Sequence, residues 1–267
     1  MIPRYVYEEI DSTNLEAVRL AKTTGGATKA PFLVCAKRQT DGRGRAGRTW
    51  QSDEGGLFFS LYLNPTFEPG NASMLTVVMA VAVAEAIEKY FADYAKQETE
   101  GKAEIAIKWP NDVVLNKKKI VGILTTLQLA DGQTEGDAPY GVVIGVGVNT
   151  NQGCFAEDLA DKATSISNEI GVSILDEILL KYIEEYFMQA YTTFEKEQNL
   201  SFLKADYEGM LINVNKQVKV LDPSGEYLAV AKGINDKGHL LVTKEDDVLV
   251  EVYAGEVSVR GIYGYVD

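Results

Sequence analysis

The sequence predicts a mixed α+β domain followed by a small all-β domain, and three patterns support this fold class. Residues 73–95 and 174–198 carry apolar side chains at the spacing of long helices. Short apolar runs with the composition of strands lie before and between these helices. Beyond the second helix, strand-length runs alternate with short polar turns such as DPSGE and NDKG, which is typical of a small β-barrel. We therefore predict a first domain at 1–212 and a barrel at 213–267.

The elements of the first domain follow in order from local signals. A helix is expected to start at Ser12, because serine, threonine and asparagine side chains there can cap the helically spaced apolar residues that follow. Strands are predicted at 32–36, 57–63, 105–109, 112–116, 120–130 and 140–149. The strands at 112–116 and 120–130 flank three lysines, and we expect them to form a hairpin.

Charge and composition argue against several classes of function. The chain has 26 basic and 39 acidic residues and a formal net charge of −13, so a broad nucleic-acid-binding face is not expected. No stretch of about 18 apolar residues is free of charge, which argues against a membrane span. The amino-terminal segment lacks the basic and apolar regions of a signal peptide, and we therefore expect a cytoplasmic location.

The side chains that most often serve in catalysis are scarce. His239 is the only histidine, so a Ser–His–Asp triad or a histidine-rich metal site would depend on it alone. Cys35 and Cys154 match neither a metal-ligand spacing nor a disulfide framework, and we expect both to be reduced and buried. We predict no metal site formed by the protein itself. Lysine, arginine, acidic, asparagine or backbone groups must then carry the chemistry.

The stretch DGRGRAGRTW, residues 41–50, places Arg43, Arg45 and Arg48 among three glycines. Its formal match to the dinucleotide fingerprint G-x-G-x-x-G is rejected, because the glycines do not follow a strand immediately and a strand rather than a helix comes next. RNA-binding Arg/Gly segments are repetitive, whereas this one occurs once. Glycine lets backbone N–H groups turn toward a ligand, and arginine binds carboxylate or phosphate bidentately. The loop is therefore predicted to bind an anion.

A second constellation surrounds Lys119. This lysine directly precedes the apolar run IVGIL, so strand alternation can turn its amine inward while its neighbour points to solvent. The spacing alone leaves open whether Lys119 is interior or extends from a strand end. Gly122 allows close approach of another group to the same strand. In the run GVGVN, Gly145 and the next alternate glycine leave room on one strand face, and Asn149 ends the run with a polar side chain.

Taken in order, these stretches resemble the bacterial biotin–protein ligases. The matching motifs are DSTN at 11–14, Q-x-x-GRGRxGRxW at 39–50, KWPND at 108–112, K-I-x-GIL at 119–124, GxGxN at 145–149 and GEVSVR at 255–260. The resemblance covers almost the whole chain. It implies an α+β fold in which a mixed-sheet catalytic domain of the biotin/lipoate ligase type is followed by a small SH3-like β-barrel.

The resemblance also implies an activity and a set of site residues. Similar proteins join biotin to ATP, which carries Mg²⁺, to form biotinyl-5′-AMP, and then transfer biotin to a lysine of a biotin carboxyl carrier protein. Arg43, Arg45 and Lys119 would be the catalytic residues, acting between the biotin carboxylate and the α-phosphate. The biotin-binding residues would be Ser12, Thr13, Asn14, Gln39, Arg43, Gly44, Arg45, Lys119, Gly122 and Gly145. The ATP-binding residues would be Arg48, Trp50, Asn111, Asn149, Glu256 and Arg260.

Some features depart from the family pattern, and two alternative functions stay open. Ala46 stands where relatives commonly carry a basic residue, and Thr126 stands where they carry an acidic one. Only about ten residues precede DSTN, so we expect a short form without the DNA-binding domain of repressing relatives, and no DNA partner. The oligomeric state is open, with a homodimer as one alternative. A lipoate–protein ligase or a non-catalytic binding module are the other candidate functions, but the complete GRGRxGRxW and KWPND motifs favour a biotin ligase.

Overall fold

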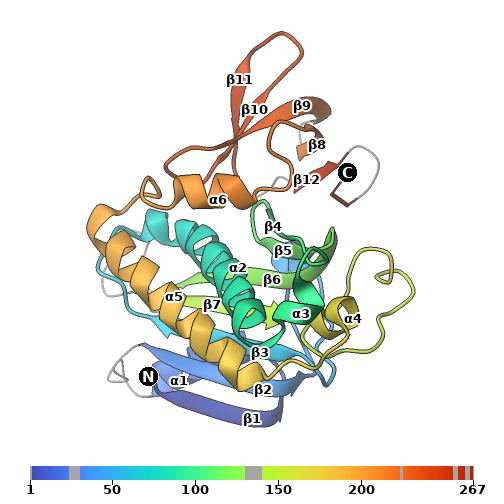
Figure 1. Cartoon of the computed structure of the whole chain (residues 1–267). Coiled ribbons are helices and arrows are strands. Elements are labelled where there is room, and N and C mark those ends of the chain that lie inside the picture. Colours follow the sequence, from blue (N-terminus) through green and yellow to red (C-terminus); the bar gives the residue numbers. More distant parts are fainter. Residues whose placement is uncertain are drawn as a thin grey trace.

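The computed structural model describes residues 2–23, 31–129, 140–222, 225–254, 258–261 and 265–266. It confirms the predicted α+β class, because a mixed sheet with helices forms one body and a separate antiparallel sheet forms a second, smaller one (Figure 1). The second sheet begins at Gln217. The domain boundary between residues 212 and 213 stays a prediction.

The larger body is built on a seven-stranded sheet with the order β1-β2-β3-β7-β6-β5-β4. Its strands are β1 (Arg4–Ile10), β2 (Phe32–Gln39), β3 (Leu57–Leu63), β4 (Ile105–Lys108), β5 (Asp112–Leu115), β6 (Lys118–Gln128) and β7 (Gly141–Val148). Strands β1 and β2 run parallel, and the other neighbouring pairs run antiparallel. All the strands predicted for this domain are confirmed, with small shifts at their ends. The predicted hairpin is β5–β6, whose turn residues Asn116 and Lys117 have the positive φ angles of 49° and 70° that two-residue hairpin turns favour.

Strand β1 was not predicted, and its position explains why. It lies at the edge of the sheet and pairs with β2 alone among the described strands. Most of its side chains are exposed or half-buried, so the stretch RYVYEEI shows no clean alternation of apolar and polar residues. A strand that buries so little of its surface leaves only a weak pattern in the sequence.

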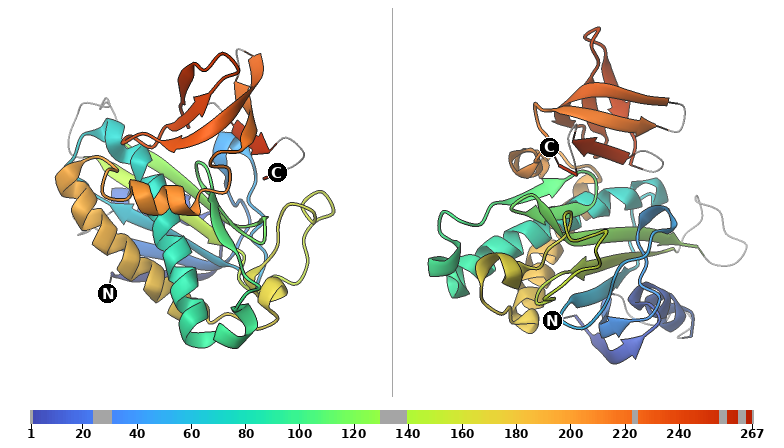
Figure 2. Two further views of the ribbon diagram at one scale, coloured as in Figure 1. Left: turned by 45° about the horizontal axis from the view of Figure 1, so that its top comes forward. Right: turned by 90° about the vertical axis from the view of Figure 1, so that its right-hand side faces the viewer.

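Helices cover both faces of this sheet. The helical elements are α1 (Thr13–Thr23), η1 (Arg45–Gly47), η2 (Pro69–Met74), α2 (Leu75–Tyr94), α3 (Lys96–Thr99), α4 (Ile166–Ile170), α5 (Asp176–Glu197) and α6 (Lys204–Met210). The predicted long helices are α2 and α5, which pack against each other on one face, and the helix expected near Ser12 is α1 on the other (Figure 2). Along β2, Leu33 and Cys35 join the α2 side of the core while Phe32 and Val34 join the α1 side.

Burial on both faces explains why several of these strands are apolar along their whole length. The expectations for a membrane span and for the two cysteines also concern burial. The segment Pro69–Tyr94 is long and apolar enough to cross a membrane, but 72% of its most apolar window is buried inside the protein, as in the core helix of a soluble fold. Cys35 is buried as expected. Cys154 is exposed in the connection after β7, so the expectation of a second buried cysteine was wrong.

The smaller body is a five-stranded antiparallel sheet with the order β11-β10-β9-β8-β12, as predicted for the carboxyl-terminal domain. Its strands are β8 (Gln217–Asp222), β9 (Gly225–Ile234), β10 (Leu240–Thr243), β11 (Leu249–Val252) and β12 (Ser258–Gly261). Alternate residues such as Val218 and Val220 are fully buried inside it. One fixed contact to the larger body is the hydrogen bond from Trp109 Nε1 to the carbonyl oxygen of Gly238, at 2.9 Å.

Candidate active site

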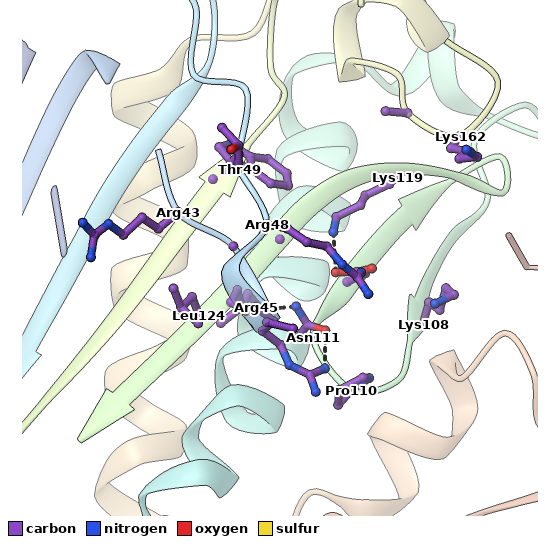
Figure 3. A pocket seen from close by; sticks show the side chains of 18 of the residues that line it. Arg43, Arg45, Arg48, Thr49, Lys108, Pro110, Asn111, Lys119, Leu124 and Lys162 are labelled. Atoms are coloured by element: carbon purple, nitrogen blue, oxygen red, sulfur yellow. Dashed lines mark hydrogen bonds and ion pairs between the residues drawn. The ribbon is translucent and has the colours of Figure 1, made fainter. Parts of the chain in front are cut away.

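A cavity of about 790 Å³ lies where the α1 side of the large sheet, the Arg/Gly loop and the small domain meet (Figure 3). Residues from β6 and β7 line it from one domain, and residues from β8 and β12 line it from the other. Every predicted site residue that the structure describes is part of this lining. Glu256, which was predicted to face ATP, lies outside the described residues.

One end of the cavity is a network of uncharged polar side chains. Gln39 Oε1 accepts hydrogen bonds from the backbone N–H and the hydroxyl of Thr13, at 2.8 and 3.1 Å. Ser60 Oγ lies 2.8 Å from Thr13 Oγ1 and 2.5 Å from Asn14 Oδ1. Ser52 Oγ accepts a hydrogen bond from Gln39 Nε2 at 2.9 Å. Since Thr13 and Ser60 are 3% and 0% exposed, the network is held rigidly in place.

Ser60 was missed by the sequence analysis. It stands in the middle of LFFSLYL, the buried strand β3, and a lone hydroxyl in an otherwise apolar strand was the signal that could have identified it. A buried hydroxyl requires hydrogen-bond partners. Those partners turned out to be the predicted biotin-binding residues.

The glycines of β6 and β7 leave room for side chains that lie on the sheet. A Cβ atom on Gly145 would come within 2.0 Å of Asn14 Oδ1. Gly147 of β7 and Gly122 of β6 are direct neighbours in the sheet. A Cβ on Gly147 would come within 2.3 Å of the Trp50 ring, and a Cβ on Gly122 within 2.6 Å. The alternate glycines predicted to open one strand face are therefore confirmed in that role. Trp50 occupies the middle of the cavity, between the polar network and the charged end.

The other end of the cavity is organised by an ion pair between a half-buried lysine and a buried carboxylate. Lys119 Nζ lies 2.6 Å from Asp112 Oδ1 and 5.2 Å from the centroid of the Trp50 ring, so the interior placement of this lysine is confirmed. Asp112 also accepts a hydrogen bond from the Tyr265 hydroxyl. Burial alone would raise the pKa of Asp112, but the charges of Lys119 and Lys108 and these hydrogen bonds hold it below its ordinary value.

Asp112 and Lys108 were not predicted as site residues, although both belong to the motif KWPND. Lys108 is 8% exposed, and its Nζ lies 4.4 Å from the centroid of the Tyr265 ring. Burial lowers the pKa of Lys108 to about 8, against the opposing effect of the Asp112 carboxylate. A charged residue at each end of a short apolar motif was the available signal, because charges are seldom buried unless they are paired.

Arg45 ties the Arg/Gly loop to both domains. Its Nη1 donates to Asn111 Oδ1 at 3.0 Å, and its Nη2 donates to the carbonyl oxygen of Ala254 in the small domain. Asn111 in turn donates to the carbonyl oxygen of Ile123 on β6 at 3.0 Å. Burial lowers the pKa of Arg45, and the nearby Asp112 carboxylate partly offsets this effect.

The other two arginines of the loop are exposed and point in different directions. Arg43 forms an ion pair with Asp41 at 2.9 Å, and Figure 3 shows its guanidinium directed away from Arg45 and Lys119. Arg48 extends toward Lys119 in the same view (Figure 3). The structure therefore brings Arg45 and Arg48 to the charged end, while Arg43 lines the cavity from the opposite side.

The predicted ATP residues outside the loop differ in how freely they can bind. Asn149 is buried, and its side chain donates to the carbonyl oxygen of Thr164 at 3.1 Å, so it holds the segment after β7. Arg260 is exposed on β12, where it pairs in register with Lys219 of β8.

The cations that line the cavity are Arg43, Arg45, Arg48, Lys108, Lys119, Lys162, Lys219 and Arg260. Among the described residues, the lining carboxylates are Asp112 and Glu226, so the described lining is strongly basic within an acidic chain.

Comparison with known proteins agrees with this architecture. Residues 7–149 match the "Biotin/lipoate A/B protein ligase family", and residues 214–260 match the "Biotin protein ligase C terminal domain". Together the two matches define a ligase that has a catalytic domain and a smaller carboxyl-terminal domain. Because the first match covers more than half of the chain, the chain belongs to the biotin/lipoate A/B protein ligase family.

Individual relatives extend this similarity over nearly the whole chain. The "Bifunctional ligase/repressor BirA" of Bacillus spizizenii is 33% identical over 259 residues, which span 95% of this chain and 73% of that protein. The "Biotin--[acetyl-CoA-carboxylase] ligase" of Paracoccus denitrificans is 28% identical and covers 87% of this chain and 90% of its own length. The "Biotin protein ligase from Aquifex aeolicus in complex with biotin and ATP" has a TM-score of 0.79 at 28% identity, with 98% of this chain and 100% of that chain covered.

Proposed function

We propose that this protein is an ATP-dependent biotin–protein ligase, a biotin–[acetyl-CoA-carboxylase] ligase in class, which activates biotin as biotinyl-5′-AMP and transfers it to a lysine of a biotin carboxyl carrier protein. The observation that carries the proposal is the division of one cavity into an uncharged polar end and a cationic end. Biotin has the same division, with a neutral ring system and a carboxylate. The similarity to a ligase that holds biotin and ATP together supports this assignment.

The uncharged end suits the ring of biotin. Thr13, Asn14 and Gln39, which line this end and are held in place by Ser60, present hydroxyl and amide groups to a neutral, urea-like group. Ser12, which is 1% exposed, lines the same end. A site built to hydrogen-bond such a group rejects an analogue that lacks it, because its own polar groups would be left unpaired. Lipoate lacks a urea-like group, so this end favours biotin.

The cationic end suits the reaction between a carboxylate and a triphosphate. One oxygen of the biotin carboxylate attacks the α-phosphorus of ATP, the bond to the β-phosphate oxygen breaks, and pyrophosphate leaves with the electron pair. Lys119, Arg45 and Arg48 would hold the two anions together and stabilise the charge that builds on the α-phosphate. No general base is needed because the carboxylate is already ionised. This chemistry therefore does not require the single histidine, His239.

Trp50 implies that the Arg/Gly loop changes its arrangement when substrates bind. Its ring lies over Gly122 and Gly147, between the two ends that a single biotin molecule has to span. A ligand that occupies this position displaces the ring and carries the loop with it, which would close the site against water. In a Trp109→Phe variant, which leaves Trp50 as the only tryptophan, fluorescence should change when biotin and ATP bind. An unchanged spectrum at saturating substrate would contradict this rearrangement.

The second step and the remaining partners follow from the same chemistry. The amine of a carrier lysine attacks the acyl carbon of the adenylate, AMP leaves, and a proton is released from the amine.

Mg²⁺ is proposed to enter with ATP as part of the substrate, since the lining carboxylates Asp112 and Glu226 are already paired with lysines. No DNA partner is proposed for a chain with a net charge of −13. We further propose a cytoplasmic location.

The direct test is transfer of labelled biotin to a purified carrier domain in the presence of Mg²⁺ and ATP. Labelling should require ATP, should appear at a single lysine of the carrier, and should not be reduced by an equal concentration of lipoate. ATP-dependent labelling with lipoate instead of biotin would identify a lipoate ligase. The absence of labelling by either acid would leave the non-catalytic alternative.

We also propose that the protein forms a homodimer, because the outer edge of β1 carries no neighbouring strand in the described part of the chain. Light scattering would measure the mass of the particle in solution.

A further inference from the structure

The end of the chain returns to the active site. Tyr265 lines the cavity, and the following residue, Val266, is 4% exposed and packs with Ala106 and Val114 of β4 and β5. Asn213 Nδ2 donates to the carbonyl oxygen of Val266 at 2.9 Å. Apolar packing and a buried hydrogen bond therefore fix the tail on the large domain, although it follows the last strand of the small one.

We propose that Tyr265 is a positioning residue of the active site, through which the carboxyl-terminal tail holds Asp112 in the orientation that places Lys119. This inference rests on the proposed ligase function and extends it to a segment outside the motifs on which the family resemblance rests. Its basis is that one side chain contacts two members of the charged end at once.

The first of these contacts is the hydrogen bond from the Tyr265 hydroxyl to Asp112 Oδ2. Lys119 Nζ lies on the other carboxylate oxygen, Oδ1, at 2.6 Å. A carboxylate with a partner on only one oxygen can rotate about its terminal torsion, which is broad. Partners on both oxygens fix its plane. Burial and the Asp112 charge raise the pKa of Tyr265 well above its ordinary value, so the hydroxyl keeps its proton and stays a donor.

The second contact is between the Tyr265 ring and Lys108. The ammonium group lies 4.4 Å from the ring centroid, within the range of a cation–π interaction. The ring thus packs against Lys108 while the hydroxyl reaches Asp112.

The decisive variant is Tyr265→Phe, which removes the hydroxyl and keeps the ring. We expect the kcat of biotin-dependent exchange between pyrophosphate and ATP to fall about tenfold, in line with the loss of one hydrogen bond to a charged group. The KM for biotin should stay within about twofold of the wild-type value, since the uncharged end is untouched. Asp112 should also titrate at higher pH, so the acid limb of the rate profile should move to higher pH.

Tyr227→Phe is the matched control. Tyr227 also lies in the small domain with a lysine ammonium over its ring, that of Lys244 at 4.3 Å, but it is not part of the cavity lining. This control should leave kcat and the pH profile unchanged. Val266→Ala loosens the tail without removing the hydroxyl, so it should lower the melting temperature and shift the pH profile in the same direction as Tyr265→Phe, but by less.

A double-mutant cycle tests the route through Asp112. If Tyr265 acts through this carboxylate, Tyr265→Phe should cost little further activity in an Asp112→Asn background. Full additivity of the two losses, or a Tyr265→Phe variant with wild-type kcat and pH profile, would overturn the proposal. Titration of the Asp112 side-chain carbon by NMR in wild type and Tyr265→Phe gives a reading that needs no activity. An unshifted Asp112 pKa refutes the positioning role, whereas a wild-type protein without biotin-dependent exchange refutes the ligase function instead.

Discussion

The two ends of the cavity are built in opposite ways. At the uncharged end, Thr13 and Ser60 are fully buried and their hydrogen bonds are already made within the protein. At the cationic end, Arg48 is exposed on a glycine-rich loop, while Lys119 is held by a buried carboxylate. A neutral ring can be recognised by a rigid surface that is already formed before the ligand binds. Two anions that must react have to be enclosed, which requires groups that can move.

This contrast predicts that substitutions at the two ends change different kinetic constants. Changes at the uncharged end should weaken biotin binding in the ground state and in the transition state alike, so they raise KM. Changes at the cationic end should act on the charge that develops during the reaction, so they lower kcat.

The largest effect is expected from Lys119→Ala. Removing a fixed cation from the position where charge develops typically lowers the rate by about 10²- to 10³-fold. The rate of adenylate formation in a single turnover measures this loss. Lys118→Ala is the matched control, because Lys118 lies next to Lys119 on β6 but outside the cavity lining, where its ammonium donates to the carbonyl oxygen of Ala160 at 3.4 Å. Equal losses in the two variants would mean that the charge of the hairpin as a whole matters, and not the placement of Lys119.

A smaller effect, of a different kind, is expected from Gly145→Ala. The new methyl group would lie 2.0 Å from Asn14 Oδ1, so Asn14 has to move and its bond to Ser60 is lost. We expect the KM for biotin to rise by about 10- to 100-fold, the equivalent of one or two hydrogen bonds. The KM for ATP should change little. Gly153→Ala, where a Cβ meets nothing within 4 Å, is the control.

Arg45→Gly should affect retention of the intermediate more than its formation. The substitution frees the loop from Asn111 and from the carbonyl oxygen of Ala254, so the cavity no longer closes tightly. Biotinyl-5′-AMP should then escape and label lysines of unrelated proteins. Mass spectrometry of a mixture of the carrier domain with serum albumin measures the selectivity. Labelling confined to the carrier lysine would show that Arg45 does not hold the loop closed.

The smallest effect concerns stability and pH. Burial lowers the pKa of Lys108 to about 8. Below that pH the Lys108 ammonium is charged in the folded protein, and burying this charge costs free energy that the unfolded chain does not lose. Between about pH 8 and the ordinary lysine pKa, the unfolded chain binds more protons, and the free energy of unfolding contributed by this group rises with pH. We expect the difference in unfolding free energy between Lys108→Met and wild type to change by about 2 kcal/mol across this range. Urea unfolding at several pH values measures it, and a difference independent of pH would contradict the assignment.

Much of the fold could be predicted because burial leaves a periodic pattern. Helices α2 and α5 and the strands from β2 to β7 bury apolar residues on one or both faces. Strand β1 escaped prediction because its side chains are exposed or half-buried, unlike those of β4 at the other edge of the sheet. The spacing of the glycines along β6 and β7 determines which strand face they open, whereas it left the placement of Lys119 undecided.

The part of the site that could not be predicted depends on contacts between distant segments. The roles of Ser60, Asp112 and Tyr265 come from partners that lie far away in the sequence. The direction of an exposed side chain is equally invisible in the sequence. Arg43 and Arg48 belong to the same motif, but one pairs with Asp41 and the other extends toward Lys119.

The most direct test of the division between the two ends is one assay applied to two variants. Biotin-dependent exchange of labelled pyrophosphate into ATP gives both kcat and the KM for biotin for Gly145→Ala and Lys119→Ala. We expect Gly145→Ala to raise KM with kcat retained, and Lys119→Ala to lower kcat with KM retained. If both variants changed the same constant, the two ends would not be separate functional parts of the cavity.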